Sequence, residues 1–354
     1  MRHKYSEYMN WAKQHSRARY NLATSGVAGF PLRELPVDFS ELEINGENSY
    51  GYAPLQEAIA QHHGVDPDCV VEAAGTSMAN HLAMAAILEP GDEVLMEWPV
   101  YGPILDAARY LGAEVKHFQR TGESGYQLDP AEVQHGVTAR TKLIVITNLH
   151  NPSSALTPEP VLRAVGDCGV TVLVDEVYLD AVYDNTPRTS FHLGPQFVVT
   201  SSLTKVYGVS GLRCGWILAQ PDLARRMRLL NDVFGATPVY PGEVLSVAAF
   251  AHLEVLRDRA RRVVEADRAA LGEFLERETA ISAPRTEWGT TSFLRLRNGN
   301  AEELLTRLRA EYETSVVPGR FFGMPDHFRI GMGVNSEMFR EGLLRLEQAL
   351  TPSR

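Results

Sequence analysis

The stretch FVVTSSLTKVYGVSGLRCGWILA, residues 197–219, contains two apolar runs separated by a polar loop. The runs FVVTSS (197–202) and GWILA (215–219) predict β-strands, because they are short, mostly apolar and bounded by Gly and Ser. Between them Lys205 is surrounded by hydroxyl residues and glycines, and Arg213 follows eight residues later. This segment is either an ordinary polar loop with a solvated lysine or a loop that holds Lys205 for chemistry.

Similar apolar runs precede this stretch. DEVLMEW (92–98), KLIVIT (142–147) and TVLVDE (171–176) also predict strands, and the helical patterns ANHLAMAAILEPG and PVLRAVGDCG lie between them, both ending at glycine. Nearly continuous apolar strands that alternate with helices are typical of a mostly parallel sheet with helices on both faces. We therefore expect a doubly wound α/β domain.

The last hundred residues show a different pattern. An amphipathic helix over about residues 242–278 is followed by the strand candidates TTSFLRLR, TSVVPG and FRIGMG, the helical stretch AEELLTRLRAEY and a last helix near 336–350. This pattern predicts a smaller α+β domain. We expect a large α/β domain over residues 41–245, and a small domain of residues 246–354 with an N-terminal arm of residues 1–40. The arm either packs on the small domain or reaches a partner subunit.

Composition excludes several classes of function. The chain has 354 residues and a formal net charge of −10, which argues against a nucleic-acid partner. The arginines in LRDRARRVVEADR (256–268) are spaced as on a solvated helix face. The three cysteines lack a CxxC spacing, and no apolar run has the length of a signal peptide core or a membrane span. We expect a soluble cytoplasmic protein.

Polar residues follow each candidate strand, at the edge where sheets of this type bind ligands. Gly75-Thr76-Ser77 opens a helix, whose free N–H groups either bind a phosphate or are simply capped. Tyr101 lies between two prolines, where it either stacks on a flat ligand or fills a crevice. Asn151 lies in the loop NLHNPSSA, in which His150 has no second metal ligand at a suitable spacing.

Two carboxyl groups end the run TVLVDE. Asp175 and Glu176 point to opposite faces of the strand, so only one of them can face a given ligand. Lys205 follows the next strand, and a cation such as Arg213 nearby would lower its pKa and make its amine nucleophilic. The glycines at 208 and 211 let the chain turn back so that Arg213 approaches the lysine.

Together these residues match the needs of pyridoxal phosphate. Its ring nitrogen needs a carboxylate, its aldehyde needs a lysine, and its phosphate needs N–H groups, hydroxyls and an arginine. The chain also resembles the fold-type I pyridoxal-phosphate enzymes, specifically the class I/II aminotransferases, from about Leu22 to the C-terminal helix. SSLTKVYGVSGLRCGW is similar to the family's S-x-x-K…G-L-R-x-G pattern, NLHNPSSALTP to its N-P-T-G loop, VLVDEVY to its D-E-x-Y strand and FRIGMG to its late arginine strand.

The resemblance implies roles around the cofactor ring. Lys205 forms the Schiff base and shuttles the proton, and Asp175 pairs with the ring nitrogen. Tyr178 and Asn151 hydrogen-bond the phenolic oxygen, and Tyr101 stacks on the ring.

The resemblance also implies how the phosphate and the substrate are held. The implied phosphate ligands are Gly75, Thr76, Ser77, Ser202 and Arg213. Arg329 receives the substrate α-carboxylate through its guanidinium fork, and Asn151 and Gly26, or Val27 in place of Gly26, also contact the substrate.

The implied assembly is a homodimer with active sites at the interface. In NSYGYAPLQEAIA either Tyr50 or Tyr52 corresponds to the tyrosine that reaches the neighbouring subunit's phosphate, and we favour Tyr50. The tract FGATPVYPG (234–242) is placed like a family segment that approaches the partner's cofactor. The chain departs from the family in having NPSS where N-P-T-G is usual.

The leading functional hypothesis is transfer of an amino group between an L-amino acid and a 2-keto acid. Other reactions of the same cofactor, such as a C–S β-lyase or an oxidative or eliminating reaction, remain as alternatives, because a fold does not determine a reaction. A non-catalytic regulator is a third hypothesis, which the combination of Lys205, Asp175 and Arg329 disfavours. Arg17, Arg19, Arg33 and Arg285 are unranked candidates for binding a substrate side chain.

Overall fold

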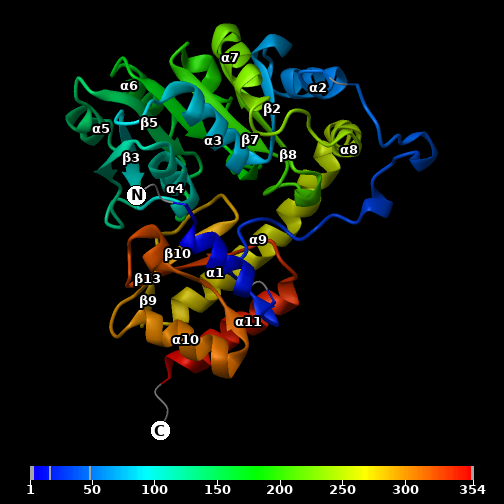
Figure 1. The fold of residues 1–354 in the computed structure, drawn as a ribbon. Coiled ribbons are helices and arrows are strands. Elements are labelled where there is room, and N and C mark those ends of the chain that lie inside the picture. Colours follow the sequence, from blue (N-terminus) through cyan, green and yellow to red (C-terminus); the bar gives the residue numbers. More distant parts are fainter. Residues whose placement is uncertain (1–3, 16, 48, 352–354) are drawn as a thin grey trace.

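A seven-stranded sheet forms the centre of the larger of two bodies (Figure 1). The computed structural model describes residues 4–15, 17–47 and 49–351. The strand order is β2-β8-β7-β6-β5-β3-β4, and every strand is parallel to its neighbours except β8, which is antiparallel to both β2 and β7. The strands are β2 Val70–Ala74, β3 Glu93–Trp98, β4 Glu114–Gln119, β5 Thr141–Thr147, β6 Thr171–Asp175, β7 Phe197–Ser202 and β8 Cys214–Leu218. The predicted doubly wound, mostly parallel α/β fold is confirmed.

Helices cover both faces of this sheet, which explains why its central strands are mostly apolar. Leu143 and Val145 of β5 pack into a cluster with α3, α4 and α7, whereas Ile144 and Ile146 pack against α5 and α6 on the opposite face. Burying such a side chain stabilises the fold by about 1.5–3 kcal/mol. The helices of this body are α2 Ala53–His63, α3 Thr76–Ile87, α4 Gly102–Leu111, α5 Pro130–Gly136, α6 Glu159–Gly166, α7 Pro221–Asn231 and α8 Tyr240–Ala251.

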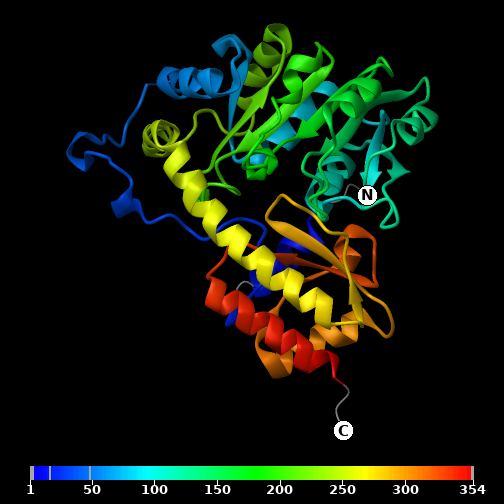
Figure 2. The same cartoon turned by 180° about the vertical axis from the view of Figure 1, so that it is seen from behind.

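The smaller body is an antiparallel sheet with three helices. Its strand order is β12-β13-β10-β9, and the long helix α9 runs from the larger body along it (Figure 2). Its elements are α9 Leu253–Arg277, β9 Ile281–Ser282, β10 Thr291–Leu296, α10 Ala301–Tyr312, β12 Val317–Pro318, β13 His327–Gly331 and α11 Ser336–Leu350. Short 3-10 helices occur at η1 Leu32–Glu34, η2 Phe39–Glu41, η3 Pro67–Cys69, η4 Leu179–Ala181, η5 Ser190–Leu193, η6 Ser210–Leu212 and η7 Gly319–Phe322.

The predicted single helix over residues 242–278 is wrong. It is divided at His252, whose φ of −127° and ψ of 24° are not helical, into α8 on the larger body and α9. The sequence hides this break because neither Gly nor Pro marks it and the amphipathic pattern continues through it. The first predicted helix also ends earlier than expected, since Leu88 after α3 is already extended and Gly91 lies in the following turn.

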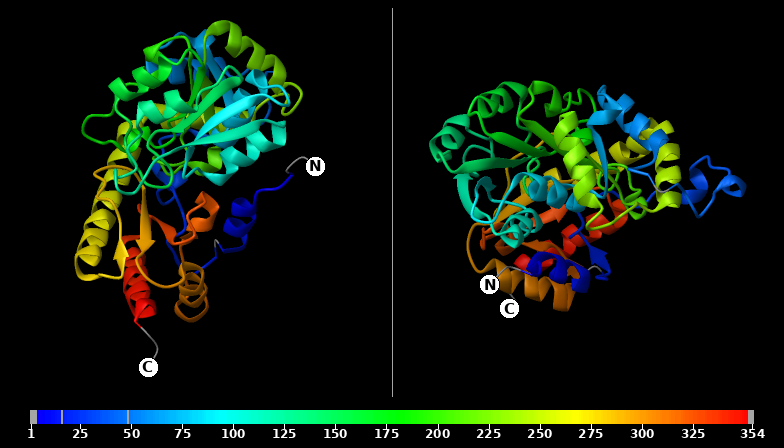
Figure 3. Two further views of the ribbon diagram at one scale, coloured as in Figure 1. Left: turned by 90° about the vertical axis from the view of Figure 1, so that its left-hand side faces the viewer. Right: turned by 45° about the horizontal axis from the view of Figure 1, so that its top comes forward.

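The N-terminal segment packs between the two bodies and then leaves them. Helix α1 (Glu7–His15) buries Tyr8 and Trp11, and the short strand β1 (Tyr20–Asn21) pairs in parallel with β11 (Thr314–Ser315). Figure 3 shows the N-terminal segment, in blue, beside the smaller body. The part that contains η1 and η2 then projects away from the rest of the chain (Figures 1 and 2).

The arginine-rich stretch of α9 is not simply a solvated face. Arg257 donates hydrogen bonds to the carbonyl oxygens of Asp180, Val182 and Tyr183, and Arg259 donates to those of Ala28 and Gly29. These two guanidinium groups therefore join α9 to loops of the larger body and to the N-terminal segment. Arg261 keeps the predicted surface role, paired with Asp184 and Glu265.

Candidate active site

A cavity of about 190 Å³ lies at the edge of the large sheet where its parallel strands end. Its walls come from the loops and helix starts that follow β2, β3, β5, β6 and β7, together with one residue of α1. The lining residues are Met9, Thr76, Ser77, Asn80, Tyr101, Thr147, Asn151, Asp175, Val177, Tyr178, Thr204, Lys205, Ser210 and Arg213. Most of the residues singled out in the sequence thus meet in one place.

Lys205 lies in the loop after β7 and points into this cavity. Its Nζ donates a 2.9 Å hydrogen bond to Ser25 Oγ. Burial lowers the pKa of Lys205 to about 8; the charges of Arg329 and Arg213 also lower it, whereas Asp175 raises it. The sequence-based attribution to Arg213 was incomplete, because burial and Arg329 contribute more. A lysine with this pKa is partly neutral near pH 7, and the neutral amine is the nucleophile.

Asp175 and Glu176 take opposite directions at the end of β6. Asp175 Oδ2 accepts a 2.8 Å hydrogen bond from Asn80 Nδ2, and its Oδ1 accepts one of 3.1 Å from the Val177 N–H. Burial raises the pKa of Asp175 to about 6, although these hydrogen bonds and Lys205 favour the carboxylate. Glu176 instead accepts hydrogen bonds from the N–H and hydroxyl of Ser190. Asp175 is therefore the carboxyl group that faces the cavity.

The start of α3 and Arg213 form an anion-binding end of the cavity. The first N–H groups of a helix have no partner within it and attract anions. Arg213 donates a 2.8 Å hydrogen bond to the Ala74 carbonyl and packs against Gly75, where φ is +80° and a Cβ would collide with the guanidinium. Strand β8 is antiparallel to β7, so it begins at the edge of the sheet where β7 ends. Arg213, the residue before β8, therefore lies at the same edge as Lys205.

A cluster of hydroxyl groups supports this end. Thr76 Oγ1 donates a 2.7 Å hydrogen bond to Ser202 Oγ, which is 2.6 Å from Thr204 Oγ1. Ser202 is buried behind the two threonines and does not itself line the cavity, whereas Thr204, which the sequence did not single out, does.

Arg329 is the central residue of β13 and is fully buried beside the cavity. Its Nη1 donates a 2.9 Å hydrogen bond to Asn151 Oδ1, and its Nη2 donates one of 2.9 Å to the Tyr8 hydroxyl and one of 3.3 Å to the Ala23 carbonyl. Asn151 thereby connects Arg329 with the cavity.

Two tyrosines complete the walls. Burial raises the pKa of Tyr178 to about 12, and burial also raises that of Tyr101, so both hydroxyls remain protonated at neutral pH and can donate hydrogen bonds. Tyr101 precedes α4, and its ring lies edge-on to that of Tyr8 at 5.3 Å.

The sequence missed Ser25, Asn80 and Met9. Ser25 bonds Lys205, whereas the neighbouring Gly26, the predicted substrate ligand, lies against the backbone of Lys205 and does not line the cavity. A signal for Asn80 was available, because it lies four residues after Thr76 on the same face of α3. Ser25 and Met9 gave no such signal.

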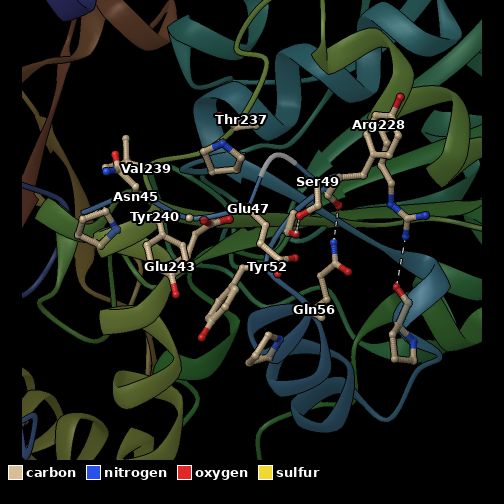
Figure 4. A pocket seen from close by; sticks show the side chains of 18 of the residues that line it. Asn45, Glu47, Ser49, Tyr52, Gln56, Arg228, Thr237, Val239, Tyr240 and Glu243 are labelled. Atoms are coloured by element: carbon tan, nitrogen blue, oxygen red, sulfur yellow. Dashed lines mark hydrogen bonds between the residues drawn. The ribbon is translucent and has the colours of Figure 1, made fainter. Parts of the chain in front are cut away.

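Tyr50 and Tyr52 lie elsewhere, on a surface groove of about 1530 Å³ (Figure 4). The groove is lined by residues from the segments 44–56, 67–68, 225–229 and 237–243, and none of the lining residues is a lysine. Tyr50 is 56% exposed, and the half-buried ring of Tyr52 lies edge-on to Tyr240 at 5.3 Å. Neither tyrosine lines the Lys205 cavity of its own chain.

Two carboxyl groups meet beneath this groove. Glu72 Oε1 accepts a 2.8 Å hydrogen bond from the Tyr52 N–H, and the carboxyl group of Glu243 at the start of α8 acts on Glu72 electrostatically. Burial, together with Glu243, raises the pKa of Glu72 to about 9, against the weaker opposing effects of the Tyr52 N–H and Arg228. The pair therefore holds a proton at neutral pH.

Glu72→Gln is expected to stabilise the protein at alkaline pH. The folded state keeps a proton on Glu72 that the unfolded state releases above the ordinary pKa of 4.5, so the contribution of Glu72 is complete below that pH and is lost as the pH rises toward about 9. The loss is at most ~1.4 kcal/mol per pH unit. Denaturant unfolding checks this: the advantage of Glu72→Gln in free energy of unfolding grows with pH, whereas Glu57→Gln on the exposed face of α2 shows none. A constant difference across pH would contradict the shared proton.

No helix among the described residues is both long and apolar enough to cross a membrane. No group of three or more His, Cys, Asp and Glu side chains in the same residues is arranged to hold a metal ion.

The family model of the aminotransferases of class I and II matches residues 39–346. The chain belongs to this family. Among similar proteins, capreomycidine synthase of Streptomyces vinaceus is 28% identical over 96% of this chain and 92% of its own. A probable aspartate/prephenate aminotransferase of Aquifex aeolicus is 27% identical over 85% of this chain and 82% of its own. The crystal structure of a PLP-dependent aminotransferase from Streptococcus suis aligns with a TM-score of 0.93 at 25% identity, over all of both chains.

The cofactor of this aminotransferase-family enzyme is pyridoxal phosphate, and the cavity fits it. Arg213 and the start of α3 suit the phosphate, because among the described ion pairs none occupies the Arg213 guanidinium. Asp175 offers one buried carboxyl group for a ring nitrogen, and Lys205 offers one amine of lowered pKa.

Proposed function

We propose that this enzyme is a transaminase that moves an amino group between an L-amino acid and a 2-keto acid, with pyridoxal phosphate attached to Lys205. The observation that carries the proposal is the buried Lys205 amine, whose pKa of about 8 is set in one cavity with Asp175 and next to Arg329. A lysine of this kind can bind an aldehyde covalently and can later accept a proton.

The cofactor is held by residues from every side of the cavity. When bound, pyridoxal phosphate supplies a protonated ring that withdraws electrons from the Cα of the substrate. Asp175 holds the proton at the ring nitrogen, and Asn80 keeps the carboxylate oriented toward it. Tyr178 and Asn151 would donate to the phenolic oxygen, and Tyr101 would stack on the ring. The phosphate is bound by Gly75, Thr76, Ser77 and Arg213, with Ser202 supporting the threonine hydroxyls.

The substrate meets two further groups. Arg329 receives the α-carboxylate, for which a guanidinium fork is well shaped. Lys205 Nζ would take the proton from Cα, because its pKa of about 8 would allow it to act as a base near neutral pH. Ser25, which accepts a hydrogen bond from Nζ, keeps the amine in position.

We assign these tasks to two domains. Residues 41–245 form the cofactor-binding domain, and residues 1–40 with 246–354 form the small domain and its arm, which contribute Arg329, Ser25 and Met9. The separate cores of the two sheets support this division.

The reaction is tested with amino donors presented to the holoenzyme together with 2-oxoglutarate or pyruvate. Transamination predicts one new amino acid per keto acid consumed and no turnover without a keto acid. Ammonia and pyruvate released in the absence of a keto acid would refute a transaminase.

A second candidate is another pyridoxal-phosphate reaction on an amino acid, including elimination. The similarity to capreomycidine synthase favours keeping it, because that relative is named a synthase and is 28% identical along nearly the whole chain. The same assay separates the two candidates, since such a reaction alters the amino acid without consuming a keto acid.

We further propose a homodimer in which Tyr50 reaches the phosphate in the partner's site. Tyr50 lies on the surface groove, away from its own Lys205, and the surrounding surface exposes apolar residues that monomers rarely expose together. Among these residues are Ile44 (80% exposed), Val233 (75%) and Val239 (73%), the last in the tract 234–242. The projecting segment with η1 and η2 lies on the same side (Figures 1 and 2).

Tyr50→Phe is expected to weaken cofactor binding about tenfold, the cost of one hydrogen bond to a charged group. Equilibrium dialysis of pyridoxal phosphate measures this, with Tyr110→Phe on α4 as the control. Sedimentation at a mass of one chain, or unchanged cofactor affinity, would contradict the shared site.

A further inference from the structure

Arg329 cannot be reached by a substrate in this structure. Its side chain is fully buried, and it does not belong to the surface of the cavity that contains Lys205. Tyr8, Asn151 and Phe322 cover it, with the guanidinium 5.8 Å from the Tyr8 ring centre and 5.3 Å from that of Phe322. One of these covering groups has to move before a carboxylate can bind.

The hydrogen bonds of Arg329 identify what a carboxylate displaces. A carboxylate that binds two guanidinium N–H groups in parallel uses either the Nη1–Nη2 edge or the Nε–Nη2 edge, so both forks need an Nη2 hydrogen. Both Nη2 hydrogens are engaged here, one by the Tyr8 hydroxyl and one by the Ala23 carbonyl. Arg329 Nε is buried without a partner among the described residues. On the Nε–Nη2 edge, the Nε hydrogen therefore has no partner among the described residues, whereas the Nη2 hydrogens are bound to Tyr8 and Ala23. The Tyr8 hydroxyl thus occupies a position that a carboxylate oxygen would take.

Of the groups that cover Arg329, Tyr8 on helix α1 can move with the smallest loss of packing. Phe322 packs with Phe293 and Val317 of the small sheet, in the same buried cluster as Tyr8 and Trp11, and Asn151 lies in a buried loop. Helix α1 has only nine residues, and its buried contacts are those of Tyr8 and Trp11. A helix this short is marginal by itself in water, so its position depends on these few contacts.

The same helix touches both the carboxylate end and the open cavity. Tyr8 lies edge-on to Tyr101 at 5.3 Å and to Phe321 at 5.6 Å, and so bridges the two bodies. Met9, the next residue, lines the Lys205 cavity, and its Sδ is 3.9 Å from the Tyr101 hydroxyl. Figures 1 and 3 show α1 at the junction between the bodies. A displacement of Tyr8 therefore also opens the wall beside the cavity.

We propose that α1 is a gate of the substrate site, in which the Tyr8 hydroxyl takes the place of the substrate α-carboxylate on Arg329 until a substrate displaces it. The proposal rests on the proposed role of Arg329 as the carboxylate-binding residue. Tyr8 is a positioning residue in this scheme: it keeps the guanidinium oriented in the empty site and competes with the substrate. Met9 moves with it.

The test uses propionate, which has a carboxylate but no amino group, and holoenzyme carrying Tyr8→Phe. Phenylalanine keeps the ring packing and removes only the hydroxyl that occupies Nη2. The dissociation constant of propionate, measured by calorimetry, is expected to fall about tenfold, because the carboxylate no longer displaces a hydrogen bond to a charged group. Tyr5→Phe, the same change on an exposed tyrosine before α1, is expected to leave it unchanged.

A second readout follows the gate itself. Amide hydrogen exchange of residues 7–15 is expected to be faster in Tyr8→Phe without propionate, and faster in the wild type once propionate binds. An unchanged or larger dissociation constant in Tyr8→Phe would overturn the gate, because the hydroxyl would then be neutral or helpful to binding.

Arg329→Lys separates this proposal from the proposed function. Propionate binding that weakens in Arg329→Lys and tightens in Tyr8→Phe supports the gate, even where the transaminase assay fails. Propionate binding that weakens in Arg329→Lys but is unchanged in Tyr8→Phe would refute the gate and leave the carboxylate site standing. Propionate binding that is unchanged in Arg329→Lys would refute both the carboxylate site at Arg329 and the gate.

Discussion

Lys205→Ala is expected to abolish covalent attachment of pyridoxal phosphate and to slow amino-group transfer by about 10³-fold. The side chain has two tasks in the proposed reaction, since its amine binds the aldehyde and later takes the Cα proton. Burial and Arg329 hold its pKa near 8, so no solvent amine of ordinary pKa replaces it at neutral pH. Denaturing mass spectrometry after borohydride reduction measures attachment, and keto-acid turnover measures transfer.

Two further variants sharpen this prediction. Lys205→Arg is expected to fail equally, because a guanidinium stays charged at any physiological pH and is no nucleophile. Lys142→Ala, on an exposed position of β5, serves as the control. In the wild type, attachment of the cofactor to the apoprotein is expected to speed up with rising pH and to level off above about 8, as the amine loses its proton. Covalent attachment in Lys205→Ala would contradict the assignment.

Asp175→Asn is expected to reduce turnover by about 10²–10⁴-fold, which corresponds to the 3–5 kcal/mol cost of breaking a buried charge pair. An amide does not hold a proton on the ring nitrogen, although it preserves the size of the side chain and a partner for Asn80. Because burial raises the pKa of Asp175 to about 6, turnover of the wild type is also expected to fall as the pH drops through that value.

Glu176→Gln is the matched control for Asp175→Asn. It neutralises the adjacent buried carboxyl group, which points away from the cavity and bonds Ser190. Turnover by Glu176→Gln is expected to stay within about twofold of the wild type, after correction for folded protein. Equal losses in the two variants would show that a structural defect, and not the ring nitrogen, explains the effect.

The sequence was most informative where a pattern is local. The apolar runs of β3, β5, β6 and β7 are visible because helices bury both faces of these strands, so most of their positions are apolar. The edge strand β4 was missed, because its residues alternate in exposure and carry charges. The break at His252 was missed for a related reason: a change of helix direction caused by packing on two bodies leaves no mark in an amphipathic pattern.

The residues of the site also divide into those that the sequence pattern predicts and those that only the structure places. The positions of Lys205, Asp175, Asn151, Tyr178 and Arg213 follow from the strand ends, because parallel strands place their carboxyl ends at one edge. Alternation along a strand shows only that the side chains of Asp175 and Glu176 point to opposite faces. The hydrogen bonds in the structure were needed to decide which of the two faces the cavity.

The sequence by itself determined the α/β fold, the family and the loop in which Lys205 lies between two strands. The tertiary structure alone decided that Ser25 bonds Lys205, that Asn80 orients Asp175 and that Tyr8 covers Arg329. These contacts join segments that lie between 95 and 321 residues apart along the chain. Such contacts depend on how helices and sheets pack against one another in three dimensions, whereas hydrophobic periodicity describes only the neighbours of each residue along one element.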